Sequence, residues 1–436
     1  MADIIFKRKI YSKLKEWKET SKGKTALLLE GARRIGKSTI VEKFAQKEYR
    51  SYILIDFNEA SKGVKGLFDD LMDMDYIFLY LQNIYKTTLY ERESVIIFDE
   101  VQQCPKARQA IKYLIKDGRY DYIETGSLIS IKKNVENILI PSEERHLNMY
   151  PMDFEEFLCA MSKTQLLQLL GKKDWACLSS MQQMLTELLR QYYFVGGMPE
   201  AVKAYVERGD IWEVRAIQNK IITAYRNDMS KHAPLQQVQR INMVWNSIPS
   251  QLARDNKKFI YGALKKGARA NDFEIAIQWL IDAGLVYKVH RVNKAALPLK
   301  FYEDMSAFKL FLLDSGLLGA LSETPPQQML IGNNVFEEYK GAFTENYVLQ
   351  QLKSLPHTFI YYYSNDNSTL EIDFVVQHNT SIIPVEVKAE ENLRAKSLRQ
   401  FTTDNPTLHG LRFSMSGYRE QDWMTNVPLW AVRWAL

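Results

Sequence analysis

A loop bounded by two glycines and ending in a lysine and two hydroxyls stands near the start of the chain, at Gly31-Ala-Arg-Arg-Ile-Gly36-Lys37-Ser38-Thr39. The apolar run Ala26–Leu29 before it predicts a buried strand, and the apolar spacing after it predicts a helix. The glycines let the backbone turn its N–H groups inward around phosphates, and Lys37 would neutralise the terminal phosphates while Ser38 holds Mg²⁺. The residues expected to bind nucleotide are Gly31, Ala32, Arg33, Arg34, Ile35, Gly36, Lys37, Ser38 and Thr39.

Two adjacent carboxylates, Asp99 and Glu100, follow a second apolar run that begins at Ser94. This is the Walker B pattern: the strand carries Asp99 to the Mg²⁺ ion, and Glu100 polarises the attacking water. Adjacent acids at a strand end also occur without such a role, but here they follow a phosphate loop at a plausible distance.

Small polar residues end a third predicted strand, at Glu124-Thr125-Gly126-Ser127. In an ATPase sheet this position faces the γ-phosphate, where the hydroxyl of Ser127, or alternatively of Thr125, holds the water. An ordinary strand-end turn explains the same residues. The residues expected to act in catalysis at this first site are Lys37, Glu100 and Ser127.

A second set of acids lies near the end of the chain, on a predicted hairpin that turns at Asn379-Thr380. A two-residue turn there sets Asp373 opposite Glu386. Paired acids without a buried counter-charge repel, so we expect Mg²⁺ or Mn²⁺ between them, with Glu345 from the preceding predicted helix as a further ligand. Lys388 would then orient or deprotonate a water. A hairpin whose charges face solvent is the alternative.

Length and composition indicate a globular protein of two or three domains, since 436 residues exceed one ordinary core. The net charge of +5, from 57 basic and 52 acidic residues, is too mild to indicate nucleic-acid binding by itself. Cys104, Cys159 and Cys177 show no metal-binding spacing, and their odd number suits a reducing cytosol. Neither a signal segment nor a long apolar run is present, so the expected location is cytoplasmic, without a membrane partner.

Alternating strands and helices up to about residue 150 predict a parallel, doubly wound sheet with its ligand at the carboxyl ends of the strands. The pattern then turns helical to about residue 232, and residues 248–293 suggest a winged-helix unit. The third helix of that unit carries Asp272, Glu274 and Asp282, which a phosphate-lined groove would repel. A packing role is therefore favoured over sequence-specific DNA recognition.

Six stretches together resemble the AAA-type P-loop ATPases of bacteria and archaea that carry a nuclease-like C-terminal domain. They are Gly31–Thr39, Phe98–Gln102, Glu124–Ser127, Tyr150–Phe157, Val195-Gly-Gly-Met-Pro199-Glu200 and Phe308–Leu318. The resemblance implies an α/β fold with an ATPase core at 1–150, a helical lid at 151–235, a winged-helix-like domain at 236–325 and a small α/β nuclease-like domain at 326–436. The Asp373…Glu386-x-Lys388 pattern resembles the core of restriction-endonuclease-like nucleases, although Ile372 stands where their proline is typical.

The function that these patterns and the resemblance imply is Mg²⁺-dependent ATP hydrolysis that controls a nuclease-like domain acting on DNA or another nucleic acid. The alternative is a regulatory ATPase switch for protein–protein contacts, with an inactive nuclease-like domain. A homo-oligomer is also expected, because AAA-type assemblies usually take an arginine from a neighbouring subunit. Arg145 is the proposed arginine, and a plain surface arginine is the alternative.

Overall fold

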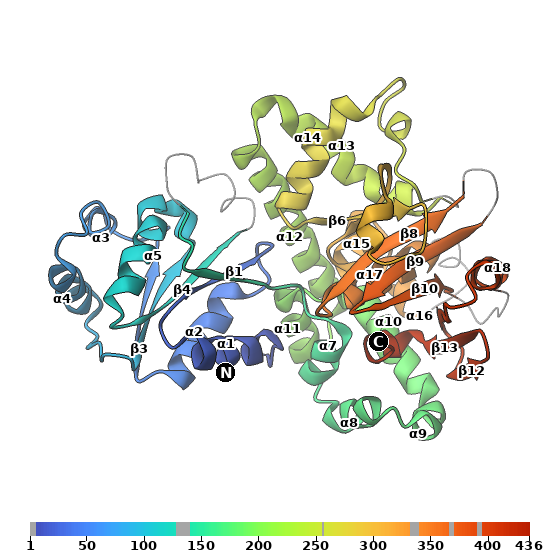
Figure 1. Cartoon of the computed structure of the whole chain (residues 1–436), viewed down its shortest axis with the longest axis horizontal. Coiled ribbons are helices and arrows are strands. Elements are labelled where there is room, and N and C mark those ends of the chain that lie inside the picture. Colours follow the sequence, from blue (N-terminus) through green and yellow to red (C-terminus); the bar gives the residue numbers. More distant parts are fainter. Residues whose placement is uncertain (1–5, 128–139, 255–256, 332–339, 366–369, 390–394) are drawn as a thin grey trace. The chain divides into compact units, whose positions relative to one another are not determined.

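The computed structural model describes residues 6–127, 140–254, 257–331, 340–365, 370–389 and 395–436 (Figure 1). The chain divides into two compact units, one formed by Met1–Tyr150 and the other by nearly all of Pro151–Leu436. No helix within the described ranges is long and apolar enough to cross a membrane. Each unit is described by itself.

The first unit is built on a parallel sheet of five strands in the order β2-β3-β4-β1-β5. The strands are β1 (Ala26–Gly31), β2 (Ser51–Asp56), β3 (Ser94–Asp99), β4 (Asp121–Ser127) and β5 (Glu144–Asn148). The helices are α1 (Ile10–Ser21), α2 (Lys37–Glu48), α3 (Lys62–Gly66), α4 (Met74–Tyr85) and α5 (Pro105–Asp117). The predicted parallel α/β sheet is confirmed, while β5 was not predicted.

Buried apolar strands and a glycine turn form the local structure around the phosphate loop. Every residue of β3 and β4 is buried, which fits strands covered on both faces. Residues of α4 and α5 share a core with Ala26 and Leu28 of β1. Gly36, with φ of 89°, adopts the left-handed conformation directly before α2 begins at Lys37. Only glycine takes this conformation at little cost, so the loop can turn sharply into the helix.

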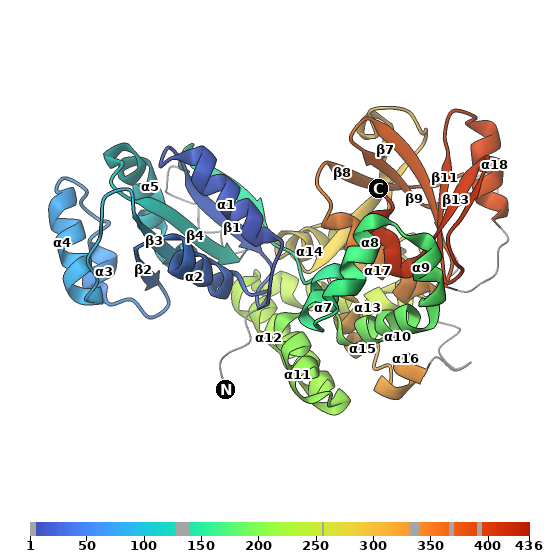
Figure 2. The same ribbon diagram turned by 90° about the horizontal axis from the view of Figure 1, so that it is seen from below.

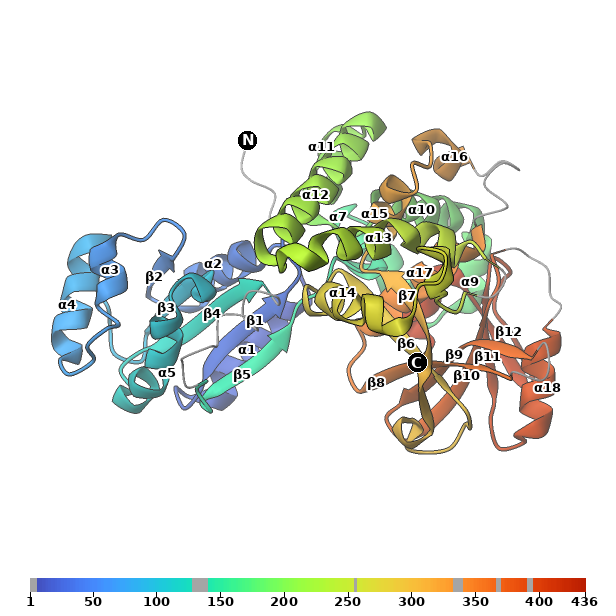
Figure 3. The same cartoon turned by 90° about the horizontal axis from the view of Figure 1, so that it is seen from above.

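The second unit holds a mixed sheet of eight strands in the order β12-β13-β11-β10-β9-β8-β6-β7. The strands are β6 (Val286–Val292), β7 (Glu303–Leu312), β8 (Thr358–Ser364), β9 (Glu371–His378), β10 (Ser381–Val387), β11 (Gly410–Ser414), β12 (Arg419–Gln421) and β13 (Met424–Pro428). Helix α17 (Lys340–Lys353) packs on one face and α18 (Lys396–Asp404) on the other (Figures 2 and 3). The predicted start of α17, near residue 335, lies outside the described residues.

Helices make up most of the remainder of this unit. They are α7 (Phe154–Ala160), α8 (Thr164–Lys172), α9 (Trp175–Ser180), α10 (Gln182–Val195), α11 (Pro199–Arg208), α12 (Ile211–His232), α13 (Leu235–Leu252), α14 (Ala270–Asp282), α15 (Ser315–Leu321) and α16 (Pro326–Ile331). The helical pattern predicted after residue 151 is therefore present.

One sheet joins strands that the sequence assigned to two separate domains. Strands β6 and β7 pair antiparallel, as a wing would, but β6 also pairs parallel with β8 through Arg291–Tyr362 and Val292–Tyr363. The adjacent prolines Pro325 and Pro326 predict a linker at the boundary between these domains, but the second of them is the first residue of α16. Proline suits the first position of a helix, where its missing N–H group has no partner to lose.

The sequence at the end of the chain predicts two edge strands, at Gly410–Met415 and Pro428–Trp434, and the structure differs from this prediction in two ways. Strand β11, expected at an edge, lies inside the sheet between β10 and β13. The strand expected at Pro428–Trp434 is wrong, because Leu429–Trp434 forms a 3₁₀ helix, η5, with Leu429 and Trp430 buried. A short apolar run does not distinguish a buried strand from a buried helical turn.

Two of the motifs that carry the family resemblance interlock in the second unit. The Asp314 carboxylate accepts hydrogen bonds from the backbone N–H groups of Gly197 (2.6 Å) and Leu317 (2.9 Å). A Cβ atom at Gly197 would lie 2.0 Å from the Met152 carbonyl oxygen, and one at Gly316 would lie 2.5 Å from the Val195 carbonyl oxygen. These glycines therefore serve close backbone packing between α10, α11 and α15.

Gly316→Ala is expected to lower the free energy of unfolding by about 3 kcal/mol, because the new methyl group meets backbone atoms that cannot move independently. Chemical denaturation measures this change. Gly319→Ala, in the same helix, is the control: its Cβ would meet the end of the flexible Met329 side chain, at 2.9 Å. If both variants lost the same free energy of unfolding, close backbone packing at Gly316 would not be the cause.

Candidate nucleotide site

The order of the strands brings the predicted nucleotide residues together at the carboxyl edge of the first sheet. Strand β4 lies between β1, which leads into the phosphate loop, and β3, which ends at Asp99. The Ser38 hydroxyl donates a hydrogen bond to Asp99 Oδ1 at 2.8 Å, and the Thr125 hydroxyl donates to the same oxygen. Ser38 and Asp99, the two predicted ligands of the nucleotide-bound metal, are thus in direct contact.

The Lys37 side chain is buried inside the loop that it was predicted to serve. Its ammonium donates to the backbone carbonyls of Gly31 (3.1 Å) and Ala32 (2.9 Å). Burial lowers the pKa of Lys37 to about 8, although the carboxylates of Glu100 and Asp99 oppose this shift. Two neutral carbonyls are weak partners for a buried cation, so the ammonium is available to an anionic ligand.

Glu100 occupies a left-handed backbone conformation, with φ of 52°, immediately after β3. Its backbone N–H donates to Thr125 Oγ1 at 3.3 Å, and the Gln102 side-chain amide donates to its carboxylate. A glutamate seldom adopts this conformation, which costs energy that the neighbouring contacts must offset. Gln102 therefore positions Glu100, a role that the sequence did not predict although Gln102 ends the Phe98–Gln102 motif.

Of the two hydroxyls predicted to act as a sensor, that of Thr125 contacts Asp99, the predicted metal ligand. Both side chains are buried, and Ser127 pairs with Gly31 across the sheet, while Thr125 bonds Asp99.

Thr125→Val is expected to lower the turnover number for ATP by about 10- to 100-fold, because Asp99 loses a hydroxyl that orients it. Ser127→Ala is expected to change turnover by no more than about 3-fold. Steady-state hydrolysis of both variants compares the two hydroxyls. If Ser127→Ala lowered turnover more than Thr125→Val does, the sensor role would belong to Ser127.

A buried charged network joins three strands of the same sheet. The Arg108 guanidinium donates two hydrogen bonds to Glu144, at 2.9 and 2.8 Å, and His146 lies 3.2 Å from Glu30 and 3.3 Å from Glu144. These carboxylates raise the pKa of His146 to about 10. Burial, reinforced by the Glu144 carboxylate, raises the pKa of Glu124 well above its usual value. Glu124 therefore stays protonated directly before Thr125.

This network predicts a pH dependence of stability. Because the folded-state pKa of His146 is raised above its unfolded value of 6.5 to about 10, its contribution is fully present below pH 6.5 and is lost as pH rises through about 10. The side chain is 45% exposed, so solvent screening reduces the contribution to about 1 kcal/mol. Denaturation between pH 6 and 10 measures it, and His146→Gln should flatten the profile. An unchanged profile in that variant would refute the assignment.

Arg145, the proposed arginine finger, lies on β5. Its guanidinium donates to Thr20 Oγ1 at 3.1 Å and lies 3.3 Å from Glu16. These contacts suit a surface arginine, and the finger stays a prediction.

The C-terminal hairpin has the predicted register. Ser381 pairs with His378 and Val385 with Phe374, so Asn379 and Thr380 form a two-residue turn. The backbone N–H of Val387 donates to the Asp373 carboxylate at 2.7 Å. Asp373 and Glu386 therefore lie on adjacent strands.

Lysines form ion pairs with two of the three predicted metal ligands, Glu345 and Glu386, and with Glu371 on the same strand as Asp373. Lys257 donates to Glu345, and the fully buried Lys309 donates to Glu371 at 2.6 Å. Lys388, predicted to act on water, lies 3.1 Å from Glu386. Among the residues described, no three His, Cys, Asp or Glu side chains are arranged to hold a metal ion.

The lysines do not fully compensate the carboxyl groups of Glu345, Asp373 and Glu386, which we call the acidic cluster. Burial raises the pKa of Asp373 to about 7, and Glu345 adds to the shift against the opposing lysines 309 and 257. One carboxyl oxygen of Glu345 and one of Glu386 are buried without a hydrogen-bond partner. The metal site formed by Glu345, Asp373 and Glu386 stays a prediction, and any metal would have to compete with lysine ammonium groups.

A family model described as an AAA domain matches residues 23–158, which contain the whole constellation from the phosphate loop to Thr125. Those residues form an AAA-type P-loop domain. Two further models, both described as domains of unknown function, match residues 186–328 (DUF8612) and 340–432 (DUF4143). The first of these spans the boundary predicted at residue 235. No curated protein matches the sequence.

Solved structures give more distant likenesses. The Walker-type ATPase of Pyrococcus abyssi is 17% identical, with 73% of this chain and 96% of that chain covered and a TM-score of 0.45. The ORC1 protein of Aeropyrum pernix in complex with DNA is 13% identical, with 75% and 95% covered and a TM-score of 0.30. The RuvB Holliday junction branch migration motor of Thermotoga maritima is 14% identical, with 65% and 89% covered and a TM-score of 0.29.

Proposed function

We propose that this protein binds ATP with Mg²⁺ in its AAA-type domain and hydrolyses it. The observation that carries the proposal is the contact of Ser38 and Thr125 with one oxygen of Asp99, beside a buried lysine whose hydrogen-bond partners among the described residues are two backbone carbonyls. A lysine, a hydroxyl and a carboxylate are the groups that a nucleotide and its metal require.

Each residue of the constellation has a distinct part in this proposal. Ser38 and Asp99 supply hard oxygen ligands, which Mg²⁺ prefers. Bound Mg²⁺ would offset the negative charge of the phosphates. Lys37 neutralises the terminal phosphates, and the N-terminus of α2 adds its dipole. Glu100, held by Gln102 and by Thr125, orients and polarises the attacking water.

The experiment that tests this function is ATP hydrolysis by the purified full chain, with and without Mg²⁺. Hydrolysis that requires Mg²⁺ and is lost in Asp99→Asn would support the proposal. Hydrolysis that survives in that variant would point to another site or to a contaminating enzyme.

For residues 326–436 we favour the regulatory switch over the nuclease. The specific observation is the set of ion pairs that Lys257, Lys309 and Lys388 make with the hairpin and helix acids. A carboxylate that is paired with lysine has less affinity for a divalent cation, which a nuclease of this type needs to activate water. Nucleic acid and a homo-oligomer remain proposed partners.

Incubation with linear, circular and single-stranded DNA, in Mn²⁺ with and without ATP, separates the two functions. We expect no cleavage of any substrate. Metal-dependent cleavage that disappears in Asp373→Asn would establish the nuclease instead.

A further inference from the structure

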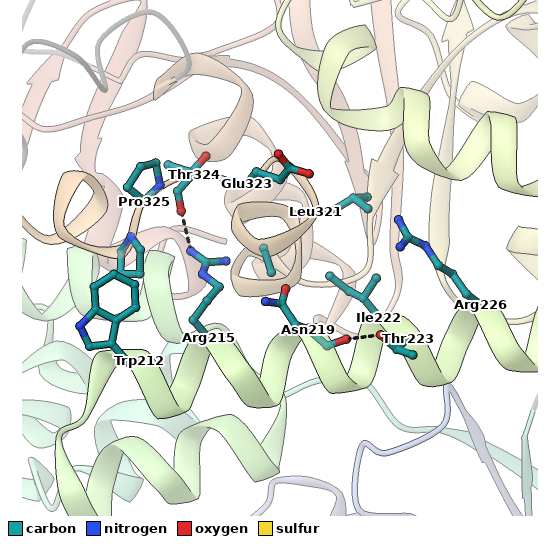
Figure 4. A pocket seen from close by; sticks show the side chains of 12 residues that line it. Trp212, Arg215, Asn219, Ile222, Thr223, Arg226, Leu321, Glu323, Thr324 and Pro325 are labelled. Carbon is teal, nitrogen blue, oxygen red and sulfur yellow. Dashed lines mark hydrogen bonds between the residues drawn. The ribbon is translucent and has the colours of Figure 1, made fainter.

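A pocket of about 560 Å³ opens in the second unit between α12 and the turn from α15 to α16 (Figure 4). Residues spaced three or four apart on one face of α12 form one wall, and residues 320–326 form the other. The α12 residues used in the argument below are Trp212, Arg215, Asn219 and Arg226. The volume lies within the range of sites for small organic ligands.

The charge of this pocket is not balanced. Arg215 donates to the Thr324 carbonyl at 2.9 Å and Arg226 to the Asn246 side chain at 3.1 Å, and no described carboxylate pairs with either guanidinium. The Nη1 atom of Arg215 is buried without a hydrogen-bond partner. Glu323, on the opposite wall, is the sole acid among the lining residues. The lining therefore keeps a net positive charge.

Burial has an energetic consequence for Arg215. Desolvation lowers the pKa of its guanidinium to about 10, with no ion pair to oppose the shift. A partly buried cation without a counter-ion destabilises the folded state, so its presence suggests that an anion completes the site.

We propose that this pocket binds the phosphate group of a small, nucleotide-sized ligand. Arg215 and Arg226 rise from α12 on either side of Asn219 (Figure 4), and their separation of eleven residues corresponds to about 16 Å of helix axis. One phosphate therefore contacts Arg215 directly, and Arg226 adds only a longer-range attraction. The Asn219 amide provides a neutral donor between them. At one end of the pocket, Trp212 is 59% exposed and offers an indole face on which a base can stack. The inference does not depend on ATP hydrolysis at the phosphate loop.

A purely structural role for Arg215 is the competing explanation, because its bond to Thr324 ties α12 to the turn after α15. The two explanations predict opposite effects of Arg215→Met. A structural tie predicts a lower melting temperature. A ligand site predicts an equal or higher melting temperature without ligand, because an uncompensated charge is removed, together with loss of binding.

Binding is tested by calorimetry on the full chain carrying Lys37→Ala, which removes the main phosphate contact of the other site. The probes are AMP, ribose 5-phosphate and inorganic phosphate. We expect AMP to bind more tightly than the other two. Arg215→Met should weaken AMP binding at least about 10-fold, and the more distant Arg226→Ala about 2- to 3-fold. Arg240→Ala, on α13 and outside the lining, is the matched control and should bind as the parent does.

Three results would overturn the proposal: no binding of any probe, equal loss of affinity in the Arg240→Ala control, or unchanged binding in Arg215→Met. A lower melting temperature of Arg215→Met with binding retained would assign Arg215 to the structural tie.

Discussion

Lys37→Ala is expected to weaken ATP binding by about 1,000-fold, because it removes the principal positive charge that meets the terminal phosphates. Calorimetry with Mg²⁺ and an ATP analogue that cannot be hydrolysed measures the change in affinity. In the wild type, a bound polyanion should raise the pKa of Lys37 from its free value of about 8. The charged form is then required for binding, so affinity should fall as pH rises above about 8, and this dependence should vanish in Lys37→Ala.

Glu100→Gln is the control for this experiment. It keeps the shape of the side chain and loses its charge, so ATP should bind about as tightly as in the wild type while turnover falls by at least about 100-fold. A Lys37→Ala protein that hydrolyses ATP at the unmodified rate would show that the phosphate loop is not the nucleotide site.

Lys257→Met is expected to make the acidic cluster bind Mn²⁺. Lys257 donates to the buried Glu345, so removing it leaves a buried carboxylate without its counter-charge. The cost is on the order of 3 kcal/mol and should lower the melting temperature in the absence of metal. A divalent cation can restore the balance, so Mn²⁺ should raise the melting temperature again.

The full chain is used for this measurement, with thermal unfolding recorded with and without Mn²⁺. Lys265→Met, an exposed lysine between α13 and α14, is the matched control and should resemble the wild type. If wild type and Lys257→Met bind Mn²⁺ equally, the lysine does not compete with metal. If Mn²⁺ stabilises neither protein, the acids form a structural ion-pair cluster and the predicted metal site is absent.

The sequence predicted those parts of the nucleotide site that are local in the chain. The phosphate loop and the acids after β3 each occupy one short segment, so their spacing alone indicates their chemistry. The contact between Thr125 and Asp99 depends instead on β4 lying between β1 and β3. Strand order is set by long-range packing, and therefore the choice between Thr125 and Ser127 stayed open.

The C-terminal acids also show that sequence predicts local contacts but not contacts between distant segments. The hairpin register was predictable, because the two-residue turn at Asn379 and Thr380 fixes it locally. Lys257 and Lys309 come from segments far earlier in the chain, and nothing in the hairpin sequence indicates them. The hairpin sequence therefore could not show that lysines from distant segments pair with Glu345 and Glu371, and the metal site itself stays a prediction.

The continuous sheet from β7 to β12 limits how this protein can be divided. A fragment that begins after residue 325 would lose β6 and β7, and it would leave β8 as an unprotected edge able to pair with other chains. It would also lack Lys257 and Lys309, so its acids should bind a divalent metal ion more tightly than the same acids in the intact protein. The C-terminal region is therefore not a transplantable module, and gene fusions or truncations should keep residues 151–436 together.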